Sequence, residues 1–119
     1  MTNSGYRRVQ LSDAVSINLP PELSPDEAQG VDTAVRIWSG DGITVLVDLG
    51  PMSDRLERHE GYETELSGHA TRVATFDDGA NHVIAAHLND PPLTISVRFE
   101  RAGQETAARR IIESLSIED

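Results

Sequence analysis

The chain contains no cysteine and no lysine, and the first absence excludes whole classes of site. Without cysteine it cannot form a disulfide framework or a thiolate metal site. Its compartment stays open, because many exported bacterial proteins also lack cysteine. All 10 basic residues are arginines, a composition that favours a bacterial source with GC-rich DNA.

Long apolar runs are absent too. No stretch approaches the roughly 18 consecutive apolar residues that a membrane span needs, and Met1 to Tyr6 is too polar for the apolar part of a signal peptide. We therefore expect a soluble protein with no membrane span, cytoplasmic by default. An exported or lipid-anchored protein whose targeting segment has been removed would show the same sequence, so that alternative stays open.

Positive charge is scarce in this chain. The 20 acidic residues outnumber the 10 basic ones, and the formal net charge is −10. Such a charge repels phosphate backbones and anionic membrane surfaces, so we expect no nucleic-acid partner. The two acidic loops, Asp48 to Glu60 and Asp77 to Asn81, would instead attract a basic protein in a salt-dependent way.

Metal-binding patterns are missing as well. His82 and His87 lie an odd number of residues apart on one predicted strand and so point to opposite faces, while His59 and His69 lie near turns. The stretch Asp77 to Asn81 resembles part of a calcium loop, but the closing glutamate is missing and a hairpin turn explains it more simply. We expect no metal and no cofactor.

Catalytic patterns are equally weak. Glu63 and Glu65 would share one strand face, about 7 Å apart, as paired carboxylates do in acid–base catalysis. Pairing with arginines on neighbouring strands, Arg36, Arg72 or Arg98, explains them better. The chain has no Gly-x-Ser-x-Gly elbow and no phosphate-binding loop. Whether the protein is an enzyme stays open, but the sequence favours a non-enzymatic role.

The C-terminal half gives the clearest secondary-structure signals. From Leu93 to Glu100 apolar and polar residues alternate, which predicts a strand with one apolar face. After Gly103 the spacing changes to the i, i+3, i+4, i+7 pattern of an amphipathic helix, with the apolar positions Ala108, Ile111, Ile112 and Leu115. We expect this helix to lie on the sheet.

The N-terminal half predicts two hairpins and two short helices. Tyr6 to Leu11 and Ala14 to Leu19 flank a Ser12-Asp13 turn, and Thr33 to Ser39 and Ile43 to Leu49 flank Gly40-Asp41-Gly42. We expect the odd-numbered apolar residues of all four strands to face the helix. Ser24 and Ser53 are candidate N-caps of two short helices, the second reaching His59.

These signals predict a single α+β domain over residues 1–119. Its sheet should be antiparallel, with about six or seven strands and the C-terminal helix packed on one face. The second face should be partly covered by a short helix or by a partner.

Four stretches carry a family resemblance: Ser16-Ile17-Asn18-Leu19-Pro20, the hairpin Trp38 to Asp54 with Asp48-Leu49-Gly50 and Ser53-Asp54, the turn Leu66-Ser67-Gly68-His69-Ala70, and the ending Ala107 to Ile117. Together they resemble the PsbP-like family and cover most of the chain. The resemblance implies a central antiparallel sheet between helical layers, and a non-enzymatic binding role like that of the family's characterised members. This sequence departs from the pattern because its first half has no long helix.

The second face of the predicted sheet is the candidate site. The residues that alternate with the core positions are less polar than a solvated face would be. This set comprises Trp38, Leu46, Phe76, Ile84, Ala86 and Leu88 beside Arg36, Asp48, Arg72 and His82. Exposed apolar area often marks an interaction site. We take Arg36, Trp38, Leu46, Asp48, Arg72 and Phe76 as a partner or ligand surface. Alternatively, the predicted helix from Pro51 to His59 covers them as a second small core.

Two functions follow from this. The favoured one is a non-catalytic binding or assembly module that meets a protein partner or a second copy of itself as a homodimer. The alternative is a small-molecule carrier or small enzyme with a pocket between the sheet and residues 51–60.

Overall fold

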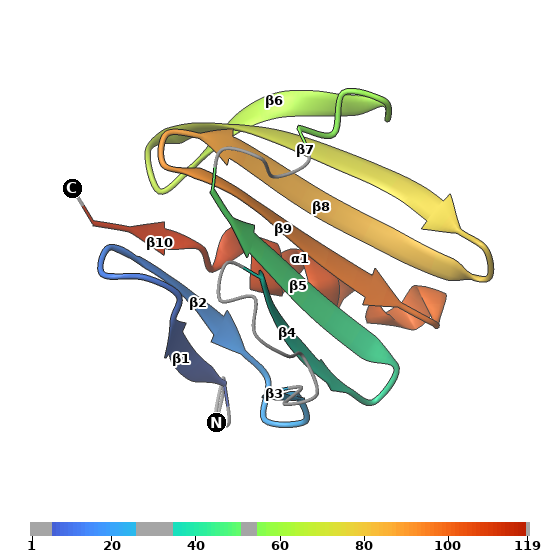
Figure 1. The fold of residues 1–119 in the computed structure, drawn as a ribbon. Helices are drawn as coiled ribbons and strands as arrows, with labels where there is room; N and C mark the ends of the chain where they lie inside the picture. Colours follow the sequence, from blue (N-terminus) through green and yellow to red (C-terminus); the bar gives the residue numbers. More distant parts are fainter. Residues whose placement is uncertain (1–5, 26–34, 51–54, 119) are drawn as a thin grey trace.

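The structure, a computed structural model, describes residues 6–25, 35–50 and 55–118 (Figure 1). These residues form two antiparallel sheets and one C-terminal helix, so the predicted α+β class is confirmed. The larger sheet has seven strands in the order β3 (Ser24–Pro25), β4 (Val35–Gly40), β5 (Ile43–Leu49), β9 (Pro92–Phe99), β8 (Asn81–Asn89), β7 (His69–Asp78) and β6 (Gly61–Leu66). The smaller has three, in the order β1 (Arg7–Gln10), β2 (Val15–Leu19) and β10 (Ser116–Ile117).

Hairpins with two-residue turns build most of the larger sheet. Their closing pairs are Gly40–Ile43, Leu66–His69, Asp78–Asn81 and Asn89–Pro92. In the first turn Asp41 and Gly42 have φ values of 53° and 79°, the left-handed conformation that such tight turns require. A two-residue turn always pairs an even-numbered residue with an odd-numbered one. If even-numbered residues of one strand point to a given face, the odd-numbered residues of the next strand in the hairpin therefore point to that face.

This parity sets the two faces of the sheet. One row across it runs through Trp38, Val45, Val97 and Ile84 on what we call the covered face. The neighbouring row, on what we call the open face, runs through Leu46, Ser96, Ala85 and Ala74. The covered face therefore combines even-numbered residues of β4, β6 and β8 with odd-numbered residues of β5, β7 and β9.

Several predicted orientations are wrong for this reason. The sequence suggests a three-residue turn at Gly40-Asp41-Gly42, which would place Val35 and Ile37 on the same face as Val45. The observed turn is one residue shorter, and a one-residue change of register moves every side chain of a strand to the other face. The parity of the β8–β9 hairpin likewise places Ile84, Ala86 and Leu88 on the covered face, not on the reverse face.

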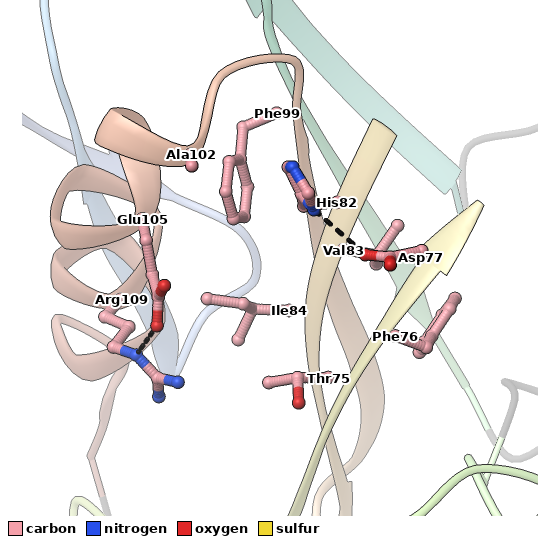
Figure 2. A pocket seen from close by; sticks show the side chains of 10 residues that line it. All are labelled: Thr75, Phe76, Asp77, His82, Val83, Ile84, Phe99, Ala102, Glu105 and Arg109. Carbon is pink, nitrogen blue, oxygen red and sulfur yellow. Dashed lines mark hydrogen bonds and ion pairs between the residues drawn. The ribbon is translucent and has the colours of Figure 1, made fainter. Parts of the chain in front are cut away.

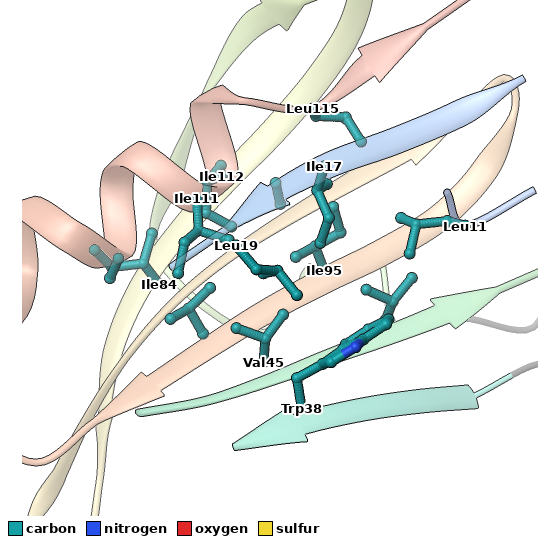
Figure 3. Close-up of a cluster of buried hydrophobic side chains, with 14 of the residues drawn as sticks. Leu11, Ile17, Leu19, Trp38, Val45, Ile84, Ile95, Ile111, Ile112 and Leu115 are labelled. Carbon is teal, nitrogen blue, oxygen red and sulfur yellow. The ribbon is translucent and has the colours of Figure 1, made fainter. Parts of the chain in front are cut away.

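A mixed layer covers one face of the seven-stranded sheet. The helix α1 (Glu105–Glu113), preceded by a 3₁₀ turn at Ala102–Gln104, contacts β8, β9 and β2. The small sheet lies beside it, and side chains of β2 and α1 point together toward the larger sheet (Figure 3). The predicted arrangement, in which the N-terminal strands share one sheet face with β5 and β9, is wrong because β1 and β2 belong to the opposing layer.

The main core lies between these two layers. Its largest fully buried side chains come from β2, the chain before β3, the central strands and α1, namely Ile17, Leu19, Leu23, Val45, Val47, Leu88, Leu93, Ile95, Val97 and Ile111 (Figure 3). Burial of each large aliphatic side chain contributes roughly 1.5–3 kcal/mol. This core is therefore the principal source of stability.

Two side chains fix the ends of the covering layer. The buried Gln104 donates from Nε2 to the carbonyl of Asp41 at 2.7 Å, which ties the start of α1 to the β4–β5 turn. At the other end, the Ser67 hydroxyl in the β6–β7 turn accepts from the backbone N–H of Ile117 at 2.9 Å. The start of α1 is thus tied to the β4–β5 turn, and β10, which follows α1, is tied to the β6–β7 turn.

The two short helices predicted in the first half are not found where the chain is described. Ser24 and Pro25 form β3 and pair with Ser39 and Trp38, and the rest of that predicted helix lies outside the described residues. Residues 55–60 form a turn, while 51–54 lie outside the described residues. Within the described ranges, no helix is long and apolar enough to cross a membrane.

Candidate binding site

A groove separates α1 from the outer strands β6 and β7 on the covered face. It consists of two adjoining hollows, of about 380 and about 260 Å³, which share Ile84 and Arg109 as lining residues. The groove exists because α1 lies against β8 and β9 while the sheet extends beyond them by two more strands. We call it the α1–β6 groove.

The first hollow opens near the start of α1 (Figure 2). Glu105 and Arg109 extend from the helix toward Ile84 and Thr75 on the strands (Figure 2). Phe99 and His82 lie at the end nearest the 3₁₀ turn. The lining is therefore mixed, with apolar residues on its floor and charged groups along the helix.

A histidine–carboxylate pair borders this hollow. His82 Nδ1 lies 2.9 Å from Asp77 Oδ1, across the β7–β8 hairpin. Their side chains are 40% and 73% exposed, respectively. An exposed hydrogen-bonded pair next to a turn is a common surface feature, and its solvation makes it a weak candidate for acid–base catalysis.

The second hollow lies between α1 and the edge strand. From β6 it is lined by Tyr62, Thr64, Glu65 and Leu66, and from the helix by Arg109, Ile112 and Glu113. Tyr62 is 51% exposed and is the one exposed large hydrophobic residue among those the structure describes. The groove thus presents an accessible aromatic side chain at its outer wall.

Arg109 lies where the two hollows meet. Its Nε donates to Glu105 Oε2 at 2.9 Å, one helical turn earlier. This hydrogen bond raises the pKa of the Arg109 guanidinium, partial burial opposes the shift, and Tyr62 adds a smaller contribution in the same direction as Glu105. Arg109 therefore stays charged at any working pH and is held in the groove wall by Glu105.

The structure divides the six residues predicted as a partner surface between the two faces. Leu46, Asp48, Arg72 and Phe76 do lie on the open face. Trp38 lies on the covered face, is only 2% exposed and belongs to the main core. Its predicted place on the second face is therefore wrong, for the register reason given above.

Arg36 also lies on the covered face, at the margin of the sheet. Its guanidinium carbon is 4.9 Å from the centre of the Trp38 ring, and its Nη1 donates to the Gln10 carbonyl at 2.9 Å. Arg36 therefore joins the edge of β4 to β1 and covers one side of the tryptophan.

The open face carries a second, smaller cluster under residues 55–60. Leu56 is 3% exposed and packs with Ala74, Val83 and Ala85. His59 stacks on Phe76, with ring centroids 3.7 Å apart and an interplanar angle of 5°. This cluster matches the alternative in which the segment after Pro51 covers part of the second face, although the described part of that segment is a turn and not a helix.

Arg72 holds this segment in place. It donates from Nε to the Leu56 carbonyl at 3.3 Å and from Nη2 to the His59 carbonyl at 2.8 Å, and its Nη1 lies 3.2 Å from Glu63 Oε2. The Glu63–Arg72 pair is one of the cross-strand charge pairs predicted from sequence. Arg72 thus serves as an anchor of the chain rather than as a free cation in a binding site.

Two smaller hollows lie on the open face of the described sheet. One, of about 210 Å³, is lined by residues that include Leu46, Asp48, Leu56 and Phe76. The other, of about 160 Å³, borders the buried His87, whose ring nitrogens lie 2.8 Å from Thr94 Oγ1 and 3.0 Å from Asn89 Oδ1. In the part of the chain that the structure describes, no group of three or more metal-ligating side chains comes together.

The sequence did not point to the α1–β6 groove. The alternation of Tyr62, Thr64 and Leu66 predicts a strand, but a strand pattern does not state how far the helix reaches across the sheet. The clearest available signal was the β6 sequence itself, in which an aromatic residue and two glutamates occur with no basic residue in a short strand.

Comparison with known proteins adds information on the fold. No family model matches the chain, and no curated protein matches it in sequence. A crystal structure of a protein from Bacteroides thetaiotaomicron VPI-5482 is similar, with a TM-score of 0.57 and 7% sequence identity over 88% of this chain and 45% of that chain. This chain therefore spans less than half of that protein. At such low identity the similarity concerns the fold alone, and the PsbP-like resemblance stays a prediction.

Proposed function

We propose that the protein is a non-catalytic binding module that takes a protein partner in the α1–β6 groove. The observation that supports this most is the groove itself, which combines two adjoining hollows, an exposed aromatic residue and a strand edge that no other described strand pairs with. Aromatic residues at the rim of a concave surface are common anchors of protein interfaces. A binding role is also what the resemblance to the PsbP-like family implies.

The ionisable groups around the groove favour binding over catalysis. The positive charge of Arg109 is balanced by the carboxylate of Glu105, and His82 pairs with Asp77 in a solvated position. Catalytic groups usually need a desolvated site in which one group activates another. These pairs instead form a polar rim around an apolar floor, which suits the recognition of a polypeptide.

The overall charge indicates a basic partner. A net charge of −10 attracts basic proteins at long range and opposes self-association. The predicted homodimer depended on Trp38 at the surface, and the burial of Trp38 removes that basis. A hetero-association through the groove is therefore the form of binding that we favour.

Site-specific photo-crosslinking in the cell of origin tests this function. A benzoylphenylalanine in place of Tyr62 should form a discrete adduct with one partner, because the side chain lies at the outer wall of the groove. The same residue in place of Thr44, on the open face of β5, is the matched control and should give no such adduct. Identical adducts at both positions, or none at Tyr62, would exclude the groove as the binding site.

A small-molecule carrier or small enzyme is the second candidate, with its pocket between the sheet and residues 51–60. The hollow of about 210 Å³ beside Leu56 and Phe76 is the observation in its favour. Ligand pockets commonly measure roughly 300–1,000 Å³ and enclose most of the ligand. The open-face hollow is below that range, so we rank this function second.

A further inference from the structure

We infer that the outer edge of β6 is a strand-addition site for an extended, basic segment of the partner protein. This inference rests on the proposed function and deepens it, because it names the backbone edge that would hold the partner and the side chains that would select it. In such recognition an extended peptide adds a strand to a sheet, and pockets for alternate side chains supply specificity.

The outer edge of β6 has no neighbouring strand among the described residues. β6 is the last strand of the seven-stranded sheet, it pairs with β7 alone among the described strands, and five of its six residues are exposed. An antiparallel ladder directs the N–H and C=O groups of every second residue away from the neighbouring strand. Counted from the hairpin-closing pair Leu66–His69, these outward groups belong to Gly61, Glu63 and Glu65.

The groove lies directly beside this edge. Tyr62, Thr64 and Leu66 point to the covered face and line the hollow of about 260 Å³. A strand added at the usual spacing of about 4.8 Å would place every second side chain next to these three residues. Apolar side chains at those positions would contact Tyr62 and Leu66 and reach toward Val73 and Ile112 on the groove floor.

The acidic side chains near the β6 edge indicate which residues the partner segment should carry at its other positions, those that point to the open-face side. By register β6 carries Glu63 and Glu65 on the open-face side, and its sequence contains no basic residue. Glu63 already has Arg72 as one partner, whereas Glu65 also borders the hollow of about 260 Å³, which Glu113 lines from the helix. Opposite charges on directly paired residues of neighbouring strands attract. The fitting partner is therefore an extended segment in which arginine or lysine alternates with aliphatic residues.

A second copy of this chain does not fit the same edge. Two-fold antiparallel pairing of β6 with itself pairs odd-numbered residues with odd-numbered ones, which brings Glu63 and Glu65 against glutamates of the mate. Like charges directly opposite each other destabilise a strand pair. The two glutamates thus disfavour self-association through this edge, as charged residues commonly do on edge strands, but they do not disfavour pairing with a basic strand.

A synthetic peptide, acetyl-Arg-Val-Arg-Val-Arg-Val-amide, is the probe for this site, and the peptide with glutamate in place of arginine is its control. In ¹H–¹⁵N spectra at low ionic strength, the basic peptide should shift the amide signals of Tyr62 to Leu66 and of the end of α1. The acidic peptide should leave them unchanged. Shifts confined to other elements, or no shifts with the basic peptide, would overturn the inference.

Alternate N-methylation of the peptide tests the backbone pairing without any change to the protein. The backbone N–H groups of an extended peptide point alternately to its two edges. Methyl groups on the backbone nitrogens of the three arginines block one edge, and methyl groups on the backbone nitrogens of the three valines block the other. Pairing with β6 uses one edge only, so one methylated peptide should bind about tenfold more weakly or worse, and the other should bind like the parent. Equal affinities of the two peptides would show that strand addition is wrong.

Two protein variants complete the test. Glu65→Pro removes an outward N–H that β7 does not use, and should weaken binding about tenfold, whereas Glu65→Gln keeps the N–H and should only reduce the salt dependence. If Glu65→Pro binds the peptide like the original chain, the edge is not the site. If the crosslink at Tyr62 forms but no basic peptide binds, the proposed binding function is supported and the strand-addition inference is wrong.

Discussion

The two faces of the seven-stranded sheet differ sharply although they are made by the same strands. Along the middle of the sheet the covered face presents Trp38, Val45, Val97 and Ile84, and the adjacent row on the open face presents Leu46, Ser96, Ala85 and Ala74. Large apolar residues thus occur where α1 and the small sheet supply a second layer. Smaller and more polar residues are commoner on the open face, where residues 55–60 are the part of the described chain that packs on the sheet.

This difference explains why the larger opening lies on the covered face. On the open face the small side chains of Ala74 and Ala85 are buried by Leu56 and its neighbours, so a short segment is enough to cover them. The covered face extends as far as β6, but α1 contacts only β8 and β9 of this sheet closely. The groove therefore forms where a face built to be buried extends beyond the layer that buries it.

The largest expected contrast is in stability. Ile111→Ala, at a fully buried position on α1, should lower the free energy of unfolding by about 2–5 kcal/mol, because it leaves a cavity in the main core. Leu46→Ala, at a half-buried position on the open face, should cost about 1 kcal/mol. Urea denaturation of both variants measures the difference, and equal losses would contradict the division into a major and a minor core.

Next in size is the anchor of residues 55–60. Arg72→Met removes two hydrogen bonds to backbone carbonyls and an ion pair, and should lower the free energy of unfolding by about 1–3 kcal/mol. Arg98→Met is a matched control on the same face, where the exposed pair with Asp78 contributes less than about 1 kcal/mol. Hydrogen exchange should quicken in residues 55–60 for Arg72→Met alone.

A smaller effect concerns the stacked rings on the open face. A double-mutant cycle with His59→Ala and Phe76→Leu should give a coupling free energy of about 0.5–1.5 kcal/mol, because the rings stack at 3.7 Å. The tilted pair His82 and Phe99, 5.4 Å apart, should give a weaker coupling in the same experiment. A coupling near zero for the stacked pair would mean that residues 55–60 do not rest on Phe76 in solution.

The smallest expected effect is at the groove wall. Glu105→Gln removes the charge of an exposed i, i+4 pair, and should lower the free energy of unfolding by about 0.3–0.5 kcal/mol. High salt should abolish the difference, because it screens the pair. A loss that persists in high salt would indicate that Glu105 stabilises α1 by another contact.

Much of the secondary structure could be predicted from the chain. The alternation from Leu93 to Phe99 and the helical spacing from Ala108 to Ile112 correspond to β9 and α1. The glycine-containing turns at Gly42 and Gly79 correspond to hairpins. These signals are local, because a strand or helix periodicity and a tight turn each depend on a few neighbouring residues.

The orientation of several strands could not be predicted in the same way. Whether Trp38 enters the core depends on whether the β4–β5 turn has two or three residues, and the sequence Gly40-Asp41-Gly42 suits both lengths. The predicted partner surface was therefore only partly correct in its grouping. Leu46, Asp48, Arg72 and Phe76 share the open face, whereas Trp38 and Arg36 lie on the covered face because the turn has two residues.

By itself the sequence determined the α+β class, most of the strands, the C-terminal helix and the acidic character of the surface, because periodicity and charge are properties of neighbouring residues. Only the tertiary structure decided that the N-terminal hairpin joins α1 in a covering layer, that Trp38 is buried, and that a groove remains beside β6. Those features depend on how far one layer reaches across another, a distance set by packing between residues that are remote in the chain.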